Sequence, residues 1–262
     1  MALTSPARIL YTSCPLCGHT SIAPFKKGDC SKHHIYHPDI PPVMTWMKCA
    51  DCEHVFTDGY FTDEACKLIF SKTQENQMVG YQLEAQRAVS ARMIEKVLPY
   101  QSSGAWMDIG IGNGSLLFTA DEYGFDVVGM DLRKDNIDIL NRLNYEAYCM
   151  DFQTFDRPGA FSVISMADVL EHMPFPVPAL KHVHTLLKDG GITFISLPNS
   201  ENVVWRIMDE NNANPYWGEI EHYHNFSRSR LFKLLSDNGF EPLRYSISER
   251  YRVCMEILAV KK

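Results

Sequence analysis

The spacing of apolar residues changes along the chain, and the change predicts different elements. Between Asp63 and Leu98 apolar residues recur at helical spacing, with Met93 and Val97 on one face, and Pro99 ends the run. Beyond residue 100, short apolar runs typical of buried strands alternate with amphipathic stretches typical of helices. The predicted strands cover 105–109, 126–130, 147–150, 161–166 and 192–197, the predicted helices cover 115–123, 135–143, 179–187 and 229–238, and the extended stretches 241–246 and 252–260 follow.

This alternation predicts the fold class and the organisation of the chain. Strands and helices that alternate through short connections form a parallel, doubly wound α/β sheet. Residues 14–59 differ, because they are rich in Cys, His and Pro and poor in helical periodicity, which is typical of a small module held by something other than a large core. We therefore expect a small module at 1–60, a helical bridge at 61–100 and an α/β domain at 101–262.

Composition and charge narrow the function classes. A chain of 262 residues that is 45% apolar can bury a full core. The formal charge is −7, no basic run is visible, and residues 1–60 carry five Lys/Arg against five acids, which argues against a nucleic acid partner. Neither a basic-then-apolar leader nor an apolar run of about 18–20 residues occurs, so we expect a cytoplasmic protein without membrane contact and leave its oligomeric state open.

A glycine-rich turn follows the first predicted strand, in the sequence Asp108-Ile-Gly-Ile-Gly-Asn-Gly. Gly110, Gly112 and Gly114 free this turn of side chains, so that a ligand can approach the main chain and the first NH groups of the next helix. Open α/β sheets bind ligands at this edge. By itself such a turn also serves as a plain connector, so it needs support from other residues.

Acidic and apolar residues at the next strand ends supply that support. Asp131 ends the second strand 23 residues after Asp108, where a carboxylate can accept hydrogen bonds from a ribose diol. Asp151 follows the third strand and can accept from an adenine amino group, while Leu132 and Phe152 can cover the faces of the ring. Together these residues predict a nucleoside site.

The glycine pattern separates two kinds of nucleoside ligand. A dinucleotide-binding turn favours Gly-x-Gly-x-x-Gly, whereas here position 115 is serine and the pattern is Gly-x-Gly-x-Gly. With Asp131, Asp151 and the segments 161–172, 187–191 and 197–199, the turn resembles the successive motifs of class I S-adenosylmethionine-dependent methyltransferases. The resemblance implies a seven-stranded, mostly parallel, Rossmann-like sheet with an antiparallel last strand. It also implies S-adenosylmethionine over the first and fourth strands, where Met166 and Ala167 join the cofactor site.

Paired cysteines predict a metal site in the first module. Cys14-Pro-Leu-Cys17 and Cys49-Ala-Asp-Cys52 are two knuckles of the kind that hold a structural zinc ion, Zn²⁺, in a closed ribbon. Cys30 and His33 offer a rival second pair. We prefer Cys49 and Cys52, because the strand-like stretches 43–48 and 54–57 frame them and can form a hairpin.

Two Glu-His pairs compete for a catalytic role. Glu171-His172, with Asp168, follows the fourth strand and could converge on a divalent cation, as in some quinone O-methyltransferases with a similar acidic stretch. Such a pair is widespread in the family, so a scaffold or helix-capping role is preferred for it. The other pair, Glu221-His222, lies among histidines, carboxylates and aromatic residues in 214–226, which is the chemistry of a substrate pocket.

The second pair is the preferred catalytic candidate. A similar dipeptide in zinc-bearing sugar C-methyltransferases is associated with base catalysis, so the resemblance implies His222 as general base supported by Glu221. The alternative is that His222 and His224 cap a helix beginning near Ser227. The sequence thus predicts a methyltransferase acting on O, N or C of a small polar metabolite. The alternatives are an rRNA or tRNA methyltransferase that docks through its ribbon, and a non-catalytic regulatory protein that binds S-adenosylmethionine.

Overall fold

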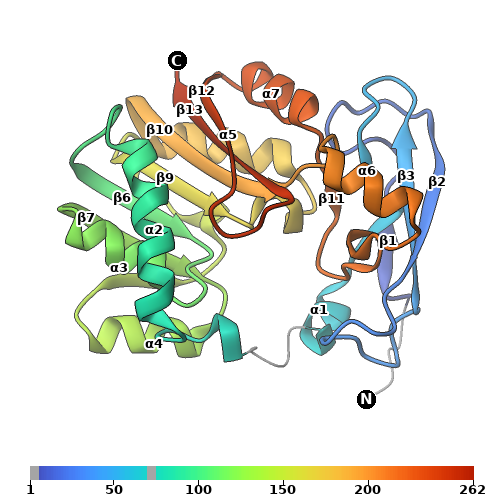
Figure 1. The fold of residues 1–262 in the computed structure, drawn as a ribbon, viewed down its shortest axis with the longest axis horizontal. Helices are drawn as coiled ribbons and strands as arrows, with labels where there is room; N and C mark the ends of the chain where they lie inside the picture. The colour runs from blue at the N-terminus through green and yellow to red at the C-terminus, as the bar shows by residue number, and fades with distance from the viewer. Residues whose placement is uncertain (1–5, 70–74) are drawn as a thin grey trace. The chain divides into compact units, whose positions relative to one another are not determined.

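The computed structural model describes residues 6–69 and 75–262, and within these residues the chain forms two compact units (Figure 1). The first unit holds 6–69, 171–177 and 198–231, and the second holds 75–170, 178–197 and 232–262. Each unit is therefore assembled from segments that lie far apart in the sequence.

The second unit is built on a sheet in which the described residues supply seven strands, in the order β12-β13-β10-β9-β6-β7-β8. β6 pairs in parallel with β7 and β9, β7 pairs in parallel with β8, and β10 pairs in parallel with β9, whereas β13 runs antiparallel to β12. This arrangement confirms the predicted doubly wound, mostly parallel sheet. The strands are β6 (Gly104–Ile109), β7 (Phe125–Asp131), β8 (Glu146–Cys149), β9 (Phe161–Ala167), β10 (Leu187–Pro198), β12 (Phe240–Ile247) and β13 (Cys254–Lys261).

Helices cover this sheet and bury its apolar residues. Met93 and Val97 of one helix pack against Trp106, Phe125 and Val163 of the strands, all of them almost fully buried. Figure 1 shows α2 and α3 side by side in front of the sheet and α5 behind it. The helices are α2 (Leu83–Val97), α3 (Ser115–Glu122), α4 (Lys134–Arg142), α5 (Pro176–Leu186) and α7 (Arg228–Asp237). None of the helices in the described part of the chain is both long and apolar enough to cross a membrane.

One boundary differs from its prediction. The helix expected at 179–187 is α5, which ends at Leu186, and β10 begins at Leu187 instead of Ile192. The register of β10 against β9 shifts between Leu187 and Ile192, because the Gly190-Gly191 pair bulges out of the ladder. The glycines that predict a helix end therefore belong to an irregular strand.

The first unit contains an antiparallel sheet of four described strands, in the order β11-β4-β3-β2. The hairpin expected at 43–48 and 54–57 is present as β3 and β4. A second ribbon pairs β1 with β5, and α1 follows it. The bounds are β1 (Arg8–Leu10), β2 (Ile22–Asp29), β3 (Val43–Cys49), β4 (Val55–Thr57), β5 (Gly59–Phe61), α1 (Asp63–Ile69) and β11 (His224–Asn225).

The segment 198–231 folds with the cysteine-bearing module, although the sequence places it within the range 101–262. It forms α6 (Val203–Glu210), a 3₁₀ turn (Pro215–Gly218) and β11, and β11 extends the module's sheet by pairing with β4. The Trp46 indole donates a hydrogen bond to the main-chain oxygen of Trp217 at 2.8 Å, which ties the 3₁₀ turn to β3. The three-part functional division at 60 and 100 stays a prediction.

Gly28 allows this turn to lie against β2, which gives a stability prediction. A Cβ at Gly28 would lie 1.7 Å from the Trp217 oxygen, so Gly28→Ala forces the two main chains apart. We expect the free energy of unfolding to fall by about 3 kcal/mol or more, at the upper end of overpacking effects. Chemical denaturation measures it, with Lys27→Ala on the same strand, where the side chain is exposed, as control. A Gly28→Ala variant as stable as this control would contradict the packing.

Candidate functional site

The glycine-rich turn leaves its main chain open at one point. Gly110, Gly112 and Gly114 all have positive φ, at +72°, +54° and +80°, a region that side chains disfavour. A Cβ at Gly110 would lie 2.6 Å from Val169 Cγ2, whereas a Cβ at Gly112 would have no atom of the described residues within 4 Å. The tip of the turn is therefore the place where a ligand can reach the main chain.

Asp131, at the end of β7, is buried and held by Arg133. Arg133 donates from Nε to Oδ1 at 2.9 Å and from Nη2 to Oδ2 at 2.8 Å, and its main-chain NH also donates to Oδ1. Since a carboxylate oxygen can accept two hydrogen bonds, Oδ2 keeps a lone pair for a ligand hydroxyl. Arg133 was not predicted from the sequence, because an arginine after a strand end has no distinctive pattern.

Residues 77–81 are held next to the glycine turn by hydrogen bonds from asparagine side chains. Asn136 donates to the main-chain oxygens of Gln77 at 2.9 Å and Gly112 at 3.1 Å. Asn113 donates to the oxygen of Tyr81 at 3.0 Å. Asparagine side chains that bridge two main-chain segments fix their spacing, so these hydrogen bonds hold residues 77–81 next to the glycine turn.

The other predicted cofactor residues follow the ends of β7, β8 and β9. Leu132 is 77% exposed, so its side chain can cover the face of a ring. Phe152 is buried, with 5% of its surface exposed. Asp151 is exposed and caps a 3₁₀ turn (Phe152–Thr154). Met166 and Ala167 are buried at the end of β9. Because β6, β7, β8 and β9 run parallel, all these residues lie along the carboxyl edge of the sheet.

Asp108 is the most deeply buried acid of this edge. It accepts a hydrogen bond from Ser165 Oγ at 2.6 Å, and Ser165 Oγ in turn accepts from the Trp106 indole at 2.8 Å. Burial raises the pKa of Asp108 to about 7, although Ser165 and the charge of Arg250 act in the opposite direction. The carboxyl group is therefore half-protonated near neutral pH.

Cys14, Cys17, Cys49 and Cys52 come together in the first unit, with all four sulfurs within 4.8 Å of one another. The Sγ atoms of Cys14 and Cys52, and those of Cys17 and Cys49, lie 3.6 Å apart. Zinc with Zn–S distances of about 2.3 Å places neighbouring sulfurs about 3.8 Å apart, so this cluster fits the ion. Cys30 instead directs its Sγ to the Pro42 oxygen at 3.3 Å.

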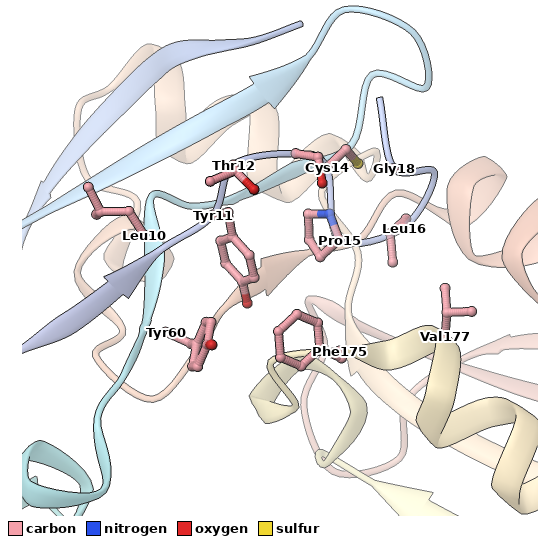
Figure 2. A pocket seen from close by; sticks show the side chains of 11 residues that line it. Leu10, Tyr11, Thr12, Cys14, Pro15, Leu16, Gly18, Tyr60, Phe175 and Val177 are labelled. Atoms are coloured by element: carbon pink, nitrogen blue, oxygen red, sulfur yellow. The ribbon is translucent and has the colours of Figure 1, made fainter. Parts of the chain in front are cut away.

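A pocket of about 380 Å³ opens beside Cys14 in the same unit. Figure 2 shows Tyr11, Tyr60 and Phe175 facing this space, with Leu16 on its opposite side. The Tyr11 hydroxyl donates to the main-chain oxygen of Pro174 at 2.7 Å. The pocket is thus lined mainly by rings and aliphatic groups.

His222 lies in a cluster with Glu171 and His172 in the first unit, in which Glu171 and His222 are buried and His172 is half-buried. The rings of His172 and His222 meet edge to face, with centroids 4.8 Å apart, and His172 Nδ1 donates to the main-chain oxygen of Glu221 at 3.0 Å. Burial lowers the pKa of His222 to about 3, with a further lowering by His172. Among the described residues, His222 Nδ1 has no hydrogen-bond partner. The imidazole is therefore neutral and has an open ring nitrogen.

Glu219 and His33 adjoin this cluster and were not predicted as a pair. Burial opposes a charge on His33, but its ion pair with Glu219 outweighs that effect and raises the pKa of His33. Glu219 also favours the charged form of His222 electrostatically. The two residues lie far apart in sequence, so no local pattern could have joined them.

The helix-capping alternative for His222 and His224 is wrong. α7 begins at Arg228, and the hydroxyl of Ser227 accepts from the NH of Arg230 at 3.1 Å, as an N-cap does. His224 instead belongs to β11 and bonds His54.

Known proteins resemble the chain in both sequence and fold. A family model described as a methyltransferase domain matches residues 81–245, more than half of the chain. Ubiquinone biosynthesis O-methyltransferases from Colwellia psychrerythraea and Burkholderia thailandensis are 28% and 31% identical over 101 residues. These alignments cover 36% of this chain and 41% and 44% of the two relatives, which is less than half of their length.

Solved structures share the fold at low identity. One is a 1,6-didemethyltoxoflavin-N1-methyltransferase from Burkholderia thailandensis with bound 1,6-didemethyltoxoflavin and S-adenosylhomocysteine. It has a TM-score of 0.59 and 17% identity, and the match covers 82% of this chain and 98% of that one. Another is a magnesium protoporphyrin IX methyltransferase from Synechocystis with bound S-adenosylhomocysteine, with a TM-score of 0.52, 17% identity, and coverage of 69% and 84%. At these identities the likeness concerns the fold.

The raised pKa of Asp108 predicts a pH-dependent stability. Its stabilising contribution is complete below the unfolded pKa of about 3.9 and is lost as the pH rises through the folded pKa of about 7. Between pH 5 and 8 the unfolding free energy of the wild type should fall relative to Asp108→Asn, by on the order of 2–4 kcal/mol. Denaturation of the cofactor-free protein measures it, with Asp126→Asn at an exposed position of β7 as control. Parallel pH profiles for wild type and Asp108→Asn would refute this.

The cysteine cluster predicts one metal ion per chain. We expect elemental analysis to find about one zinc in the purified protein and almost none in Cys49→Ser, because three thiolates hold zinc far more weakly than four. Cys30→Ser should keep its zinc, since Cys30 points elsewhere. Zinc loss in Cys30→Ser with retention in Cys49→Ser would support the rival pair instead.

Proposed function

Because the chain belongs to the methyltransferase domain family, we propose that it is an S-adenosylmethionine-dependent methyltransferase that acts on a small polar metabolite, with His222 as general base. The fold and the family support the transfer of a methyl group. The state of the His222 imidazole is the observation that carries the assignment of the base.

The residues at the carboxyl edge of the sheet suit this cofactor. When bound, S-adenosylmethionine supplies a methyl group on a sulfonium, which is electrophilic without further activation. Gly112 would admit it to the main chain, and Asp131 would accept from its ribose hydroxyls. Asp151 and Leu132 would contact the adenine ring, the first as acceptor and the second by packing.

His222 has the properties that a base needs. A hydroxyl or an amine must lose a proton as it takes up a methyl group, and a neutral imidazole with an open nitrogen can accept that proton. A pKa of about 3 makes the free imidazole a weak base, and the charge of Glu219, which favours the imidazolium, keeps this pKa from falling further. His172 holds the main chain at Glu221 by a hydrogen bond, which orients the segment that carries His222. We assign Glu219, alongside Glu221, to the support of the base.

The acceptor is inferred from the polar groups of the first unit. Among the described residues, His33 Nδ1, His222 Nδ1 and both polar side-chain atoms of Asn225 are buried without a hydrogen-bond partner. Buried polar atoms normally have partners, so these atoms of the first unit suit a small acceptor that brings its own donors and acceptors. The solved relative with bound 1,6-didemethyltoxoflavin supports an acceptor of that size. The net negative charge of the chain favours a small acceptor over RNA.

Replacement of His222 tests the proposed base. His222→Ala should lower turnover about 100-fold to 10,000-fold, the usual contribution of a general base, and should leave the dissociation constant of S-adenosylhomocysteine within about twofold. Release of S-adenosylhomocysteine from a panel of small hydroxyl and amine compounds identifies an acceptor with the wild type and then measures the variant. His184→Ala, on α5 in the second unit, is the matched control. Unaltered turnover in His222→Ala would exclude His222 as the base.

A further inference from the structure

Main-chain hydrogen bonds clamp the residue next to His222 from two sides. The NH of Tyr223 donates to the oxygen of Glu171 at 2.9 Å, and its own oxygen accepts from the NH of Thr57 at 2.9 Å. Thr57 belongs to β4, the strand that directly follows the second cysteine knuckle. The position of His222 along this segment is therefore set by the knuckle's own hairpin.

A second path runs through side chains from the knuckle to the same segment. The NH of Cys49 donates to the oxygen of His54 at 3.0 Å, which closes the knuckle. His54 Nε2 and His224 Nδ1 lie 3.0 Å apart, and His224 Nε2 lies 2.9 Å from the oxygen of Met173. Three consecutive hydrogen bonds thus connect Cys49 to His224, two residues after His222, and to Met173, which follows His172.

The partners determine the direction of each bond. The Met173 oxygen can only accept, so His224 carries its proton on Nε2 and offers a lone pair at Nδ1. His54 must then donate from Nε2 to His224 Nδ1. The His224 ring is neutral, since burial lowers its pKa to about 3. The chain of donors is therefore defined at every atom.

Histidine at position 54 carries a cost that an apolar residue would avoid. The ring stacks on Phe56 at 5.8 Å and tilts against Phe226 at 5.0 Å, in surroundings where phenylalanine would pack well. Within the described part of the chain, His54 Nδ1 is buried and finds no hydrogen-bond partner. Such an atom destabilises the fold, so the feature that histidine adds is the bond to His224.

We propose that His54 and His224 are positioning residues through which the cysteine knuckle holds the Glu221-His222 segment, so that metal loss impairs methyl transfer and leaves cofactor binding unchanged. The proposal rests on the proposed function for its effect on turnover. The ordering of 219–226 by His54 is independent of whether His222 is the base. Every residue of the path lies in the first unit, whereas the predicted cofactor residues lie in the second.

Hydrogen exchange of the zinc-loaded full chain tests the proposal. In His54→Leu, which keeps the bulk and removes the donor, peptides covering 219–226 should exchange about tenfold faster, and turnover should fall about tenfold. His54→Gln, which keeps a donor near the Nε2 position, should restore most of both. The dissociation constant of S-adenosylhomocysteine should stay within twofold in all variants. His184→Leu in the second unit is the matched control and should leave exchange at 219–226 unchanged.

Removal of the metal is the second arm. After chelation, the same peptides should gain exchange while S-adenosylhomocysteine binds as before. Unchanged exchange at 219–226 in His54→Leu or in the metal-free chain would overturn the proposal. A His54→Gln variant as impaired as His54→Leu would do so too, because ring shape and not the donor would then matter. If His222→Ala keeps full turnover but His54→Leu loosens 219–226, only the proposed base fails.

The wild-type protein offers a test that needs no variant. Nitrogen-15 NMR of the histidine rings should show both His54 and His224 as neutral Nε2–H tautomers, with a coupling across the hydrogen bond from His54 Nε2 to His224 Nδ1. An Nδ1–H tautomer at His224 would reverse the chain and overturn the proposal. This measurement stands even if the His54 variants fail to fold.

Discussion

The pairing of β11 with β4 is the contact on which the candidate catalytic segment depends. β11 is only two residues long, His224 and Asn225, and so brief a strand has little stability of its own. It persists because β4 presents an open edge immediately after the cysteine knuckle, and because the His54 and His224 rings add a side-chain bond to the ladder. The hairpin that carries Cys49 and Cys52 therefore also pairs with a segment that lies far away in the sequence.

This pairing explains why the first unit is assembled from three separate stretches of chain. Residues 171–177 follow β9 in the sequence, and residues 198–231 begin at the last residue of β10. They nevertheless form hydrogen bonds with the cysteine-bearing module. Main-chain groups buried away from water must be paired, and strand ends provide few partners. The edge of β4 and the Trp46 indole of β3 supply such partners. The units found by packing therefore differ from the domains expected from the order of elements along the sequence.

Burial then decides the chemistry of the charged groups in both units. Desolvation keeps Asp108 partly protonated at the first strand end and keeps His222 neutral in its cluster. A nearby charge can outweigh desolvation. The ion pair with Glu219 raises the pKa of His33 although burial alone would lower it. A carboxylate or an imidazole at one of these positions therefore has a protonation state that its residue type alone does not predict. The two knuckles depend on spacing instead, since four closely spaced cysteine sulfurs suit a cation.

The sequence by itself determined the doubly wound sheet, the glycine turn and the cysteine pairs, because each depends on residues close together in the chain. Periodicity marks strands and helices, positive φ requires glycine at 110, 112 and 114, and Cys-x-x-Cys spacing forms a knuckle locally. Only the tertiary structure decided that Arg133 holds Asp131, that Glu219 reaches His33, and that His224 bonds His54 instead of capping a helix. The last two contacts join residues about 170 or more positions apart, and such partners are set by which strand edges and buried polar atoms remain unsatisfied after the local elements form.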